Sequence, residues 1–222
     1  MNSPLNAISP LDGRYSERVK ELSPIFSESA LMRYRLKVEI EYLIALSNEK
    51  GVQEIAPFSA KETKLLRDLY NRFSESDGKR VKQIEKITDH DVKALEYFAK
   101  EKLKKVLPLE VFEFFHSALT SEDINNISYS LMLQDGIGVY LKFVKKLLAE
   151  LRQSAVKHKN LAILSLTHSQ PATPTTMGHE LAVFYARIKR QVENLTAIKL
   201  TAKFSGATGN WAAHSVAYPN VD

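Results

Sequence analysis

Apolar residues recur every three or four positions through most of this chain, and this spacing restricts it to a helical fold. The clearest run extends over about six turns. It consists of Met177, Leu181, Phe184, Ile188, Val192, Leu195 and Ile198. An alternating strand pattern or an Asn-Gly hairpin signal is not evident in the sequence. We therefore expect an all-α protein with long helices suited to a bundle.

Helix starts are indicated by capping patterns. Ser59 and Glu62 have capping-box spacing, as do Thr88 and Asp91, and Ser121 is a candidate cap for a third helix. Residues that disfavour helix mark the expected interruptions. Residues 74–80 read as a polar loop, while Gly136 and Gly138 are expected to kink or break the helix around them.

Composition excludes several classes of protein. The chain has 222 residues, 44% of them hydrophobic, and no cysteine, which excludes a disulfide scaffold and a thiolate metal site. The N-terminus lacks a basic region followed by an apolar run, and no window approaches the ~18 apolar residues of a membrane span. We expect a soluble, cytoplasmic protein with no membrane partner.

A net charge of +5 raises the question of a nucleic-acid partner. The basic residues are scattered and have acidic neighbours, as in residues 101–105, and no helix-turn-helix, zinc or RNA-binding motif is present. We expect no nucleic-acid partner, and the charge suits an anionic small molecule. The histidines have no metal-site spacing, and no phosphate loop or dinucleotide fingerprint occurs, so we expect neither metal nor cofactor.

Two polar segments in the first half of the chain are candidates for ligand binding. Residues 9–15 contain an Asp-Gly turn, on which Arg14 and Tyr15 could present a guanidinium and a phenol to a phosphate. In residues 88–92, His90 lies near a helix start whose free amides favour anions. Each segment also has a purely structural interpretation. Residues 9–15 could be only a turn, and residues 88–92 could be only a helix cap.

Two further polar segments lie in the second half. Thr120 and Ser121 place two hydroxyls at a helix start, where they could bind a carboxylate together with the free amides, or could only cap the helix. His168 lies in Thr-His-Ser-Gln, ahead of two prolines that hold the chain extended. A histidine placed there suits a general acid or base, and its structural alternative is a brace for the turn.

Taken together, these segments resemble the adenylosuccinate lyases of the fumarase/aspartase superfamily. The matching strings are Ser-Pro-Leu-Asp-Gly-Arg-Tyr (9–15), Thr-Asp-His-Asp-Val-Lys-Ala-Leu-Glu-Tyr-Phe (88–98), Thr-Ser-Glu-Asp-Ile-Asn-Asn (120–126), Thr-His-Ser-Gln-Pro-Ala-Thr-Pro-Thr-Thr-Met-Gly-His-Glu (167–180) and Gly-Ala-Thr-Gly-Asn (206–210). The resemblance extends from residue 8 to the C-terminus.

The resemblance implies a fumarase/aspartase-like fold, with an N-terminal helical domain in residues 1–112 and the first part of a central helical bundle in residues 113–222. It implies a homotetramer whose active sites combine several subunits. The implied reaction is elimination of fumarate from adenylosuccinate to give AMP, or from the succinylcarboxamide ribotide (SAICAR) of purine biosynthesis. In this chemistry, a base removes the proton beside a carboxylate and an acid protonates the departing nitrogen.

The resemblance also assigns residues. His168 corresponds to the general acid. The positions that correspond to substrate binding are Arg14, Tyr15, Asp89, His90, Asp91, Thr120 and Ser121. Two positions depart from the family pattern: Asp89 occupies a position where we expect asparagine, and Ser169 a position where we expect glycine.

Family members are longer and carry a Ser-Ser-x-Met-Pro-x-Lys-x-Asn loop whose serine is assigned as the catalytic base, and no such string occurs here. We therefore expect a fragment of the enzyme that is inactive by itself. One alternative is another superfamily lyase, with argininosuccinate or malate as substrate. The other is a non-catalytic helical assembly fragment.

Overall fold

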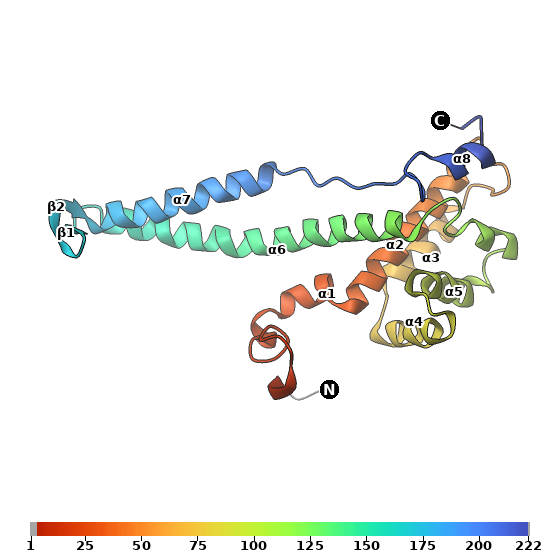
Figure 1. Ribbon diagram of the computed structural model, residues 1–222, viewed down its shortest axis with the longest axis horizontal. Coiled ribbons are helices and arrows are strands. Elements are labelled where there is room, and N and C mark those ends of the chain that lie inside the picture. Colours follow the sequence, from red (N-terminus) through yellow and green to blue (C-terminus); the bar gives the residue numbers. More distant parts are fainter. Residues whose placement is uncertain (1–3, 222) are drawn as a thin grey trace. The chain divides into compact units, whose positions relative to one another are not determined.

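The computed structural model describes residues 4–221, and most of them are helical (Figure 1). The α-helices are α1 (Ser23–Phe26), α2 (Glu28–Asn48), α3 (Ala60–Asn71), α4 (Glu75–Thr88), α5 (Asp91–Leu103), α6 (Ser121–Lys157), α7 (Met177–Ala197) and α8 (Ala212–Ala217). Short 3-10 helices cover Pro4–Asn6, Ser16–Arg18, Lys20–Leu22 and Leu109–Phe114. The strands are β1 (Ala162–Thr167) and β2 (Gln170–Thr176).

The chain forms two compact units. Unit 1 extends to Asp135 and includes the segment from Thr201 onwards, and unit 2 is Gly136–Leu200. The all-α prediction is confirmed, with one hairpin as the exception. The predicted domain boundary between residues 112 and 113 stays a prediction.

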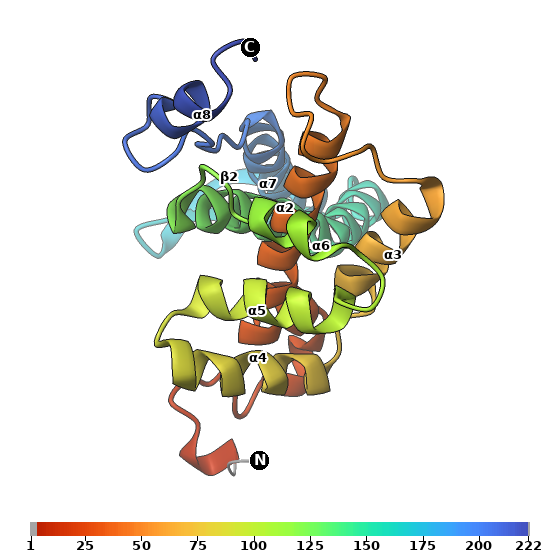
Figure 2. The same ribbon diagram turned by 90° about the vertical axis from the view of Figure 1, so that its right-hand side faces the viewer.

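Helix α2 forms the centre of unit 1. It begins after Ser27, whose Oγ accepts the N–H of Ala30 at 3.2 Å. Helices α3, α4 and α5 pack around it, and Figure 2 shows α4 and α5 side by side. Because neighbours cover α2 on several faces, its buried residues do not follow a single stripe. The most deeply buried apolar residues of this core are Leu36, Ile40, Leu43, Leu66, Val81, Leu95 and Phe98.

Capping boxes fix the starts of α3 and α4. The predicted box at Ser59 is confirmed, since Ser59 and Glu62 exchange both hydrogen bonds. The predicted loop at residues 74–80 is wrong. Ser74 and Asp77 form a second capping box, with Ser74 N–H donating to Asp77 Oδ2 at 3.0 Å, and α4 begins at Glu75. Local hydrogen bonding thus starts a helix within a segment that its polar composition marks as loop.

Unit 2 contains most of α6, the hairpin and α7. The predicted break at Gly136 and Gly138 is wrong, because α6 continues without interruption from Ser121 to Lys157. The predicted absence of strands is also wrong, because β1 and β2 form an antiparallel hairpin joined by His168 and Ser169. The final predicted helix is confirmed as α7, although the short α8 follows it.

The start of α7 meets the end of α6 through a close backbone contact. Gly178, in the first turn of α7, donates its N–H to His158 O at 3.0 Å. A Cβ at this position would lie 2.4 Å from Ala155 O, so only glycine fits there.

Among residues 4–221, none of the helices has the length and hydropathy needed to cross a bilayer.

Candidate active site

The segment around His90 links two helices of unit 1. Asp89 ends α4 in the left-handed conformation, with φ of 49°. His90 then caps α5, because its Nδ1 accepts the N–H of Lys93 at 3.1 Å. The predicted capping box of Thr88 and Asp91 is therefore wrong. Thr88 is the last residue of α4, and the cap of α5 is the histidine ring.

A cavity of about 500 Å³ opens at this helix start. The predicted binding residues Asp89, His90 and Asp91 all line it. The other lining residues are Glu28, Lys82, Glu85 and Lys86. Lys82 pairs with Glu85 at 2.7 Å and with Glu28 at 3.4 Å, so charges of both signs surround the space.

Asp91 is also held by a buried cation that the sequence prediction missed. Arg35 of α2 approaches Asp91 Oδ2 with its Nη1 at 2.7 Å, and its Nε donates to Asn125 Oδ1 at 2.8 Å. Burial raises the pKa of Asp91, but the positive charge of Arg35 and the Val92 N–H outweigh it and hold the pKa below its usual value. Asp91 is therefore an ionised, anchored carboxylate.

The start of α6 carries the predicted hydroxyl pair. Helix α6 begins at Ser121, so the residue ahead of its first turn is Thr120, not Ser121 as predicted. The N–H of Thr120 donates to Asp123 Oδ2 at 2.9 Å. Both hydroxyl-bearing residues are half-buried and lie at a helix N-terminus, where free amides favour anions.

Asp123 joins this helix start to the segment 203–210. Its carboxylate is fully buried and accepts the N–H groups of Ser205 and Gly206, each at 3.1 Å, and Lys203 Nζ at 2.7 Å. Burial raises the pKa of Asp123, but these donors, Lys203 foremost, bring it below its ordinary value. The predicted fifth segment, 206–210, is thereby anchored at Gly206 to the first turn of α6.

Arg14 and Tyr15 lie on the predicted turn, which the Ser9 carbonyl closes by accepting the N–H of Gly13 at 3.1 Å. The guanidiniums of Arg14 and Arg18 lie over the Tyr15 ring, at 5.3 and 5.7 Å from its centroid. The Arg14 side chain is exposed and thus accessible to an anion.

His168 lies in unit 2, at the tip of the hairpin. Thr167 pairs with Gln170, so the loop consists of His168 and Ser169, with φ of 51° and 60°. Two positive φ values in a two-residue loop are typical of a type I′ turn, which favours glycine and asparagine. The glycine expected at position 169 would fit this conformation without strain. The loop thus holds an exposed histidine in a strained backbone, a feature that clusters at functional sites.

The remaining predicted residues all belong to unit 1. Within that unit, the structure joins the segments 89–91 and 120–126 through Arg35, and 120–126 and 206–210 through Asp123. The sequence carries only a weak signal for such residues. Arg35 and Glu39 are charged and four positions apart, and therefore share one face of α2, but Arg33, Lys37 and Glu41 of the same helix are charged as well.

A second buried pair lies close by. Glu39, only 1% exposed, accepts the backbone N–H of His116 at 3.1 Å and lies 2.6 Å from His116 Nδ1. Burial lowers the pKa of His116, but the neighbouring Glu39 carboxylate outweighs it and raises the pKa above the usual value. His116 thus serves as the counter-charge of a carboxylate in the protein interior.

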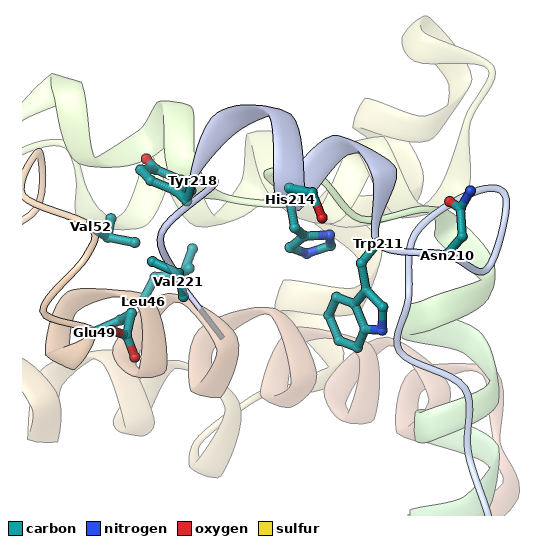
Figure 3. Close-up of a pocket in the computed structure, with 9 residues that line it drawn as sticks. Leu46, Glu49, Val52, Asn210, Trp211, His214, Tyr218 and Val221 are labelled. Carbon is teal, nitrogen blue, oxygen red and sulfur yellow. The ribbon is translucent and has the colours of Figure 1, made fainter.

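Unit 1 also has a cavity of about 580 Å³ between α2 and α8, drawn in Figure 3. His214 and Trp211 line it in an edge-to-face arrangement, with ring centroids 4.8 Å apart. Burial lowers the pKa of His214. Asn210 lines this cavity too, but the residues assigned to catalysis or substrate binding do not.

Sequence comparison identifies the family. The family model for lyases matches residues 13–221, which include both units. The chain belongs to the lyase family. This lyase is 45% identical to the adenylosuccinate lyase of Legionella pneumophila, over 98% of this chain and 48% of that protein. The identity is 47% to the adenylosuccinate lyase of Dictyostelium discoideum, with the same coverage, and 43% to that of Escherichia coli, over 99% and 49%.

These matches confirm the resemblance drawn from the motifs. The chain spans about half the length of the curated relatives it matches. Solved structures confirm the fold. A fumarate lyase from Mesorhizobium sp. BNC1 superposes with a TM-score of 0.72 at 19% identity, over 90% of this chain and 45% of that one. A 3-carboxy-cis,cis-muconate lactonizing enzyme from Pseudomonas putida gives 0.70 at 20%, over 90% and 44%.

Proposed function

We propose that this lyase takes part in adenylosuccinate cleavage, releasing fumarate from adenylosuccinate to give AMP and from SAICAR in the same way. The observation that carries the proposal is 45% identity to an adenylosuccinate lyase over 98% of the chain. Because that stretch covers both units, it includes the His90, Thr120 and His168 segments together. We propose that the activity belongs to a protein of the relatives' length, of which this chain supplies one half.

His168 is the general acid in this proposal, protonating the nitrogen that leaves carbon. Its support is an exposed imidazole on a short, strained turn, whose fixed backbone presents the ring at the tip of the hairpin. The base that removes the proton beside the carboxylate is a serine outside this chain. The electron pair left on that carbon is delocalised into the carboxylate and then expels the nitrogen, forming the double bond of fumarate.

The other predicted residues bind the substrate. Thr120 and Ser121 hold the succinyl carboxylates, supported by their position at the N-terminus of α6. Arg14 binds the phosphate through its exposed guanidinium, with Tyr15 beside it. His90 and Asp91 contribute to the nucleotide side, with Asp89 at the same cavity.

We further propose the assembly and location expected from the sequence, a homotetramer in the cytoplasm. A tetramer would bring together units from different copies, so His168 of one copy could serve binding residues of another. The exposed apolar side chains of unit 2 support such an assembly, since they have little cover within the unit.

The experiment that tests the function is a substrate comparison with the lyase at the length of its curated relatives. Adenylosuccinate, SAICAR, argininosuccinate and malate are each incubated with the enzyme, and the products are separated chromatographically. We expect fumarate from both purine substrates and no turnover of the other two. If the enzyme released fumarate from argininosuccinate or malate and not from the purine substrates, the proposal would be wrong, and the corresponding superfamily reaction would take its place.

The 222-residue chain by itself is the matched control. We expect it to be inactive on adenylosuccinate, because catalytic groups that act as a unit lose nearly all of their effect when one is removed. Turnover by the pure chain would contradict the placement of the base outside it.

A further inference from the structure

Arg35 is a buried cation whose two partners come from two different helix starts. Only 7% of its side chain is exposed, at the middle of α2. Its Nη1 lies 2.7 Å from Asp91 Oδ2, and its Nε donates to Asn125 Oδ1 at 2.8 Å. Burying a guanidinium costs free energy unless the group has such partners. Loss of either contact would leave part of the buried charge without compensation, so the folded state favours keeping both.

Each partner lies next to residues assigned to substrate binding. Asp91 follows His90 at the start of α5. Asn125 lies four positions after Ser121 and therefore one turn along the same face of α6. A single planar side chain consequently fixes the spacing between two helix N-termini.

We propose that Arg35 is a positioning residue of this lyase, which sets the distance between the nucleotide-binding start of α5 and the carboxylate-binding start of α6. A succinylated nucleotide carries both recognised groups on one molecule, so it can use both helix starts only at the correct spacing. The inference rests on the proposed function, because that function assigns the two helix starts to the two ends of the substrate.

The charge of Arg35 has a second consequence. The Asp91 carboxylate lines the charged cavity at the start of α5, where an uncompensated negative charge would repel a phosphorylated ligand. With Arg35 on Oδ2 and the Val92 N–H on Oδ1 at 2.9 Å, that charge is balanced from inside the protein. Asp91 can then remain ionised beside an anionic substrate.

A spacing role predicts an effect that depends on whether the two recognised groups are joined. In adenylosuccinate, binding of one end presents the other at a high effective concentration, and this gain requires correct geometry. AMP and fumarate are separate molecules, and each needs only its own helix start. A change in the distance between the two helix starts should therefore weaken binding of the joined substrate much more than binding of the separate products.

The test uses Arg35→Lys in the lyase at the length of its relatives. Lysine keeps the charge but lacks the planar fork, so it cannot bond Asp91 and Asn125 in the same geometry. We expect the KM for adenylosuccinate to rise about tenfold or more, since linked binding commonly gains far more than that. We expect the inhibition constants of AMP and of fumarate, measured separately, to stay within about twofold, because neither product uses both sites.

Arg67→Lys is the matched control. Arg67 forms a fork on Glu41, with Nε and Nη2 each 2.8 Å from a carboxylate oxygen, and this pair also joins a helix to α2. Neither residue contacts a predicted site residue, so we expect an unchanged KM. If Arg35→Lys does not fold, Asn125→Ala removes one of the two contacts and is judged by the same comparison.

Three outcomes would overturn the inference. The first is an unchanged KM for adenylosuccinate in a folded Arg35 variant. The second is an equal loss of affinity for AMP, fumarate and adenylosuccinate, which would indicate general disruption of the site. The third, failure of the unsubstituted lyase to cleave adenylosuccinate, would overturn the proposed function and this inference with it.

Discussion

At the scale of single residues, the interior of unit 1 depends on charges that neutralise one another. Glu39 is 1% exposed, and its two carboxylate oxygens contact the ring and the backbone of His116. Because a buried carboxylate is stable only with such partners, His116 is a structural residue in our account. We assign His116 no role in binding or catalysis.

This pairing gives the first prediction. His116→Ala leaves Glu39 buried without its ring partner, and breaking a buried pair in this way costs about 3–5 kcal/mol. We expect that loss in the free energy of unfolding, measured by urea denaturation. Glu39→Gln is the control, because a neutral amide needs no counter-charge and should cost less. A loss in His116→Ala no larger than the ~1 kcal/mol of a surface ion pair would contradict the buried-pair account.

At the scale of secondary-structure elements, the start of α7 in unit 2 meets the end of α6 at Gly178. A Cβ there would lie 2.4 Å from Ala155 O and 2.6 Å from Lys159 Cα, both backbone atoms that cannot swing aside. We expect Gly178→Ala to destabilise unit 2 by about 1–3 kcal/mol, as other forced overpacking does. Amide hydrogen exchange in residues 155–178 would report the change.

Gly138→Ala is the matched control within the same unit. Its Cβ would meet no atom within 4 Å, and alanine is favoured over glycine inside a helix by up to ~1 kcal/mol. We expect a slight stabilisation. Equal exchange rates in the two variants would show that the backbone contact at Gly178 is not required.

The elements also show how far the sequence predicts the fold. Helix α7 and the capping box at Ser59 follow from local patterns, and both are confirmed. The hairpin could not be predicted, because His168 and Ser169 adopt a turn that normally uses glycine or asparagine. Likewise, Ser74 starts a helix within a polar run, since its bonds to Asp77 outweigh composition.

The candidate site was predicted in part for a similar reason. Motif residues such as His90, Thr120 and His168 are visible in the sequence because their polar types interrupt apolar periodicity. Arg35 was missed because its role depends on partners 56 and 90 positions away, which local patterns do not report. Residues that join segments across the fold become evident only in three dimensions.

At the scale of the whole molecule, unit 2 leaves large apolar side chains in solvent. Those at least 48% exposed are Tyr140, Phe143, Leu147, Val156, Leu161, Leu164, Leu166, Phe184 and Ile198. Because long helices with such faces pack against partners, we expect the 222-residue chain to associate with itself.

Size-exclusion chromatography with light scattering tests this prediction. Dimers, tetramers or larger species are the expected result, and Phe143→Glu with Phe184→Glu should shift the population towards monomer. A monodisperse monomer of the unsubstituted chain at high concentration would contradict it.

The central claim is that this chain carries the general acid of an adenylosuccinate lyase. If His168 protonates the leaving nitrogen, His168→Ala should lower kcat by ~10² to 10⁴-fold and change KM little. Arg14→Ala should instead raise KM, since a guanidinium on phosphate acts in ground state and transition state alike. The decisive measurement is the kcat on adenylosuccinate of folded His168→Ala enzyme at the length of the curated relatives. We predict a loss of at least ~10²-fold, and a kcat near that of the unsubstituted enzyme would contradict the assignment.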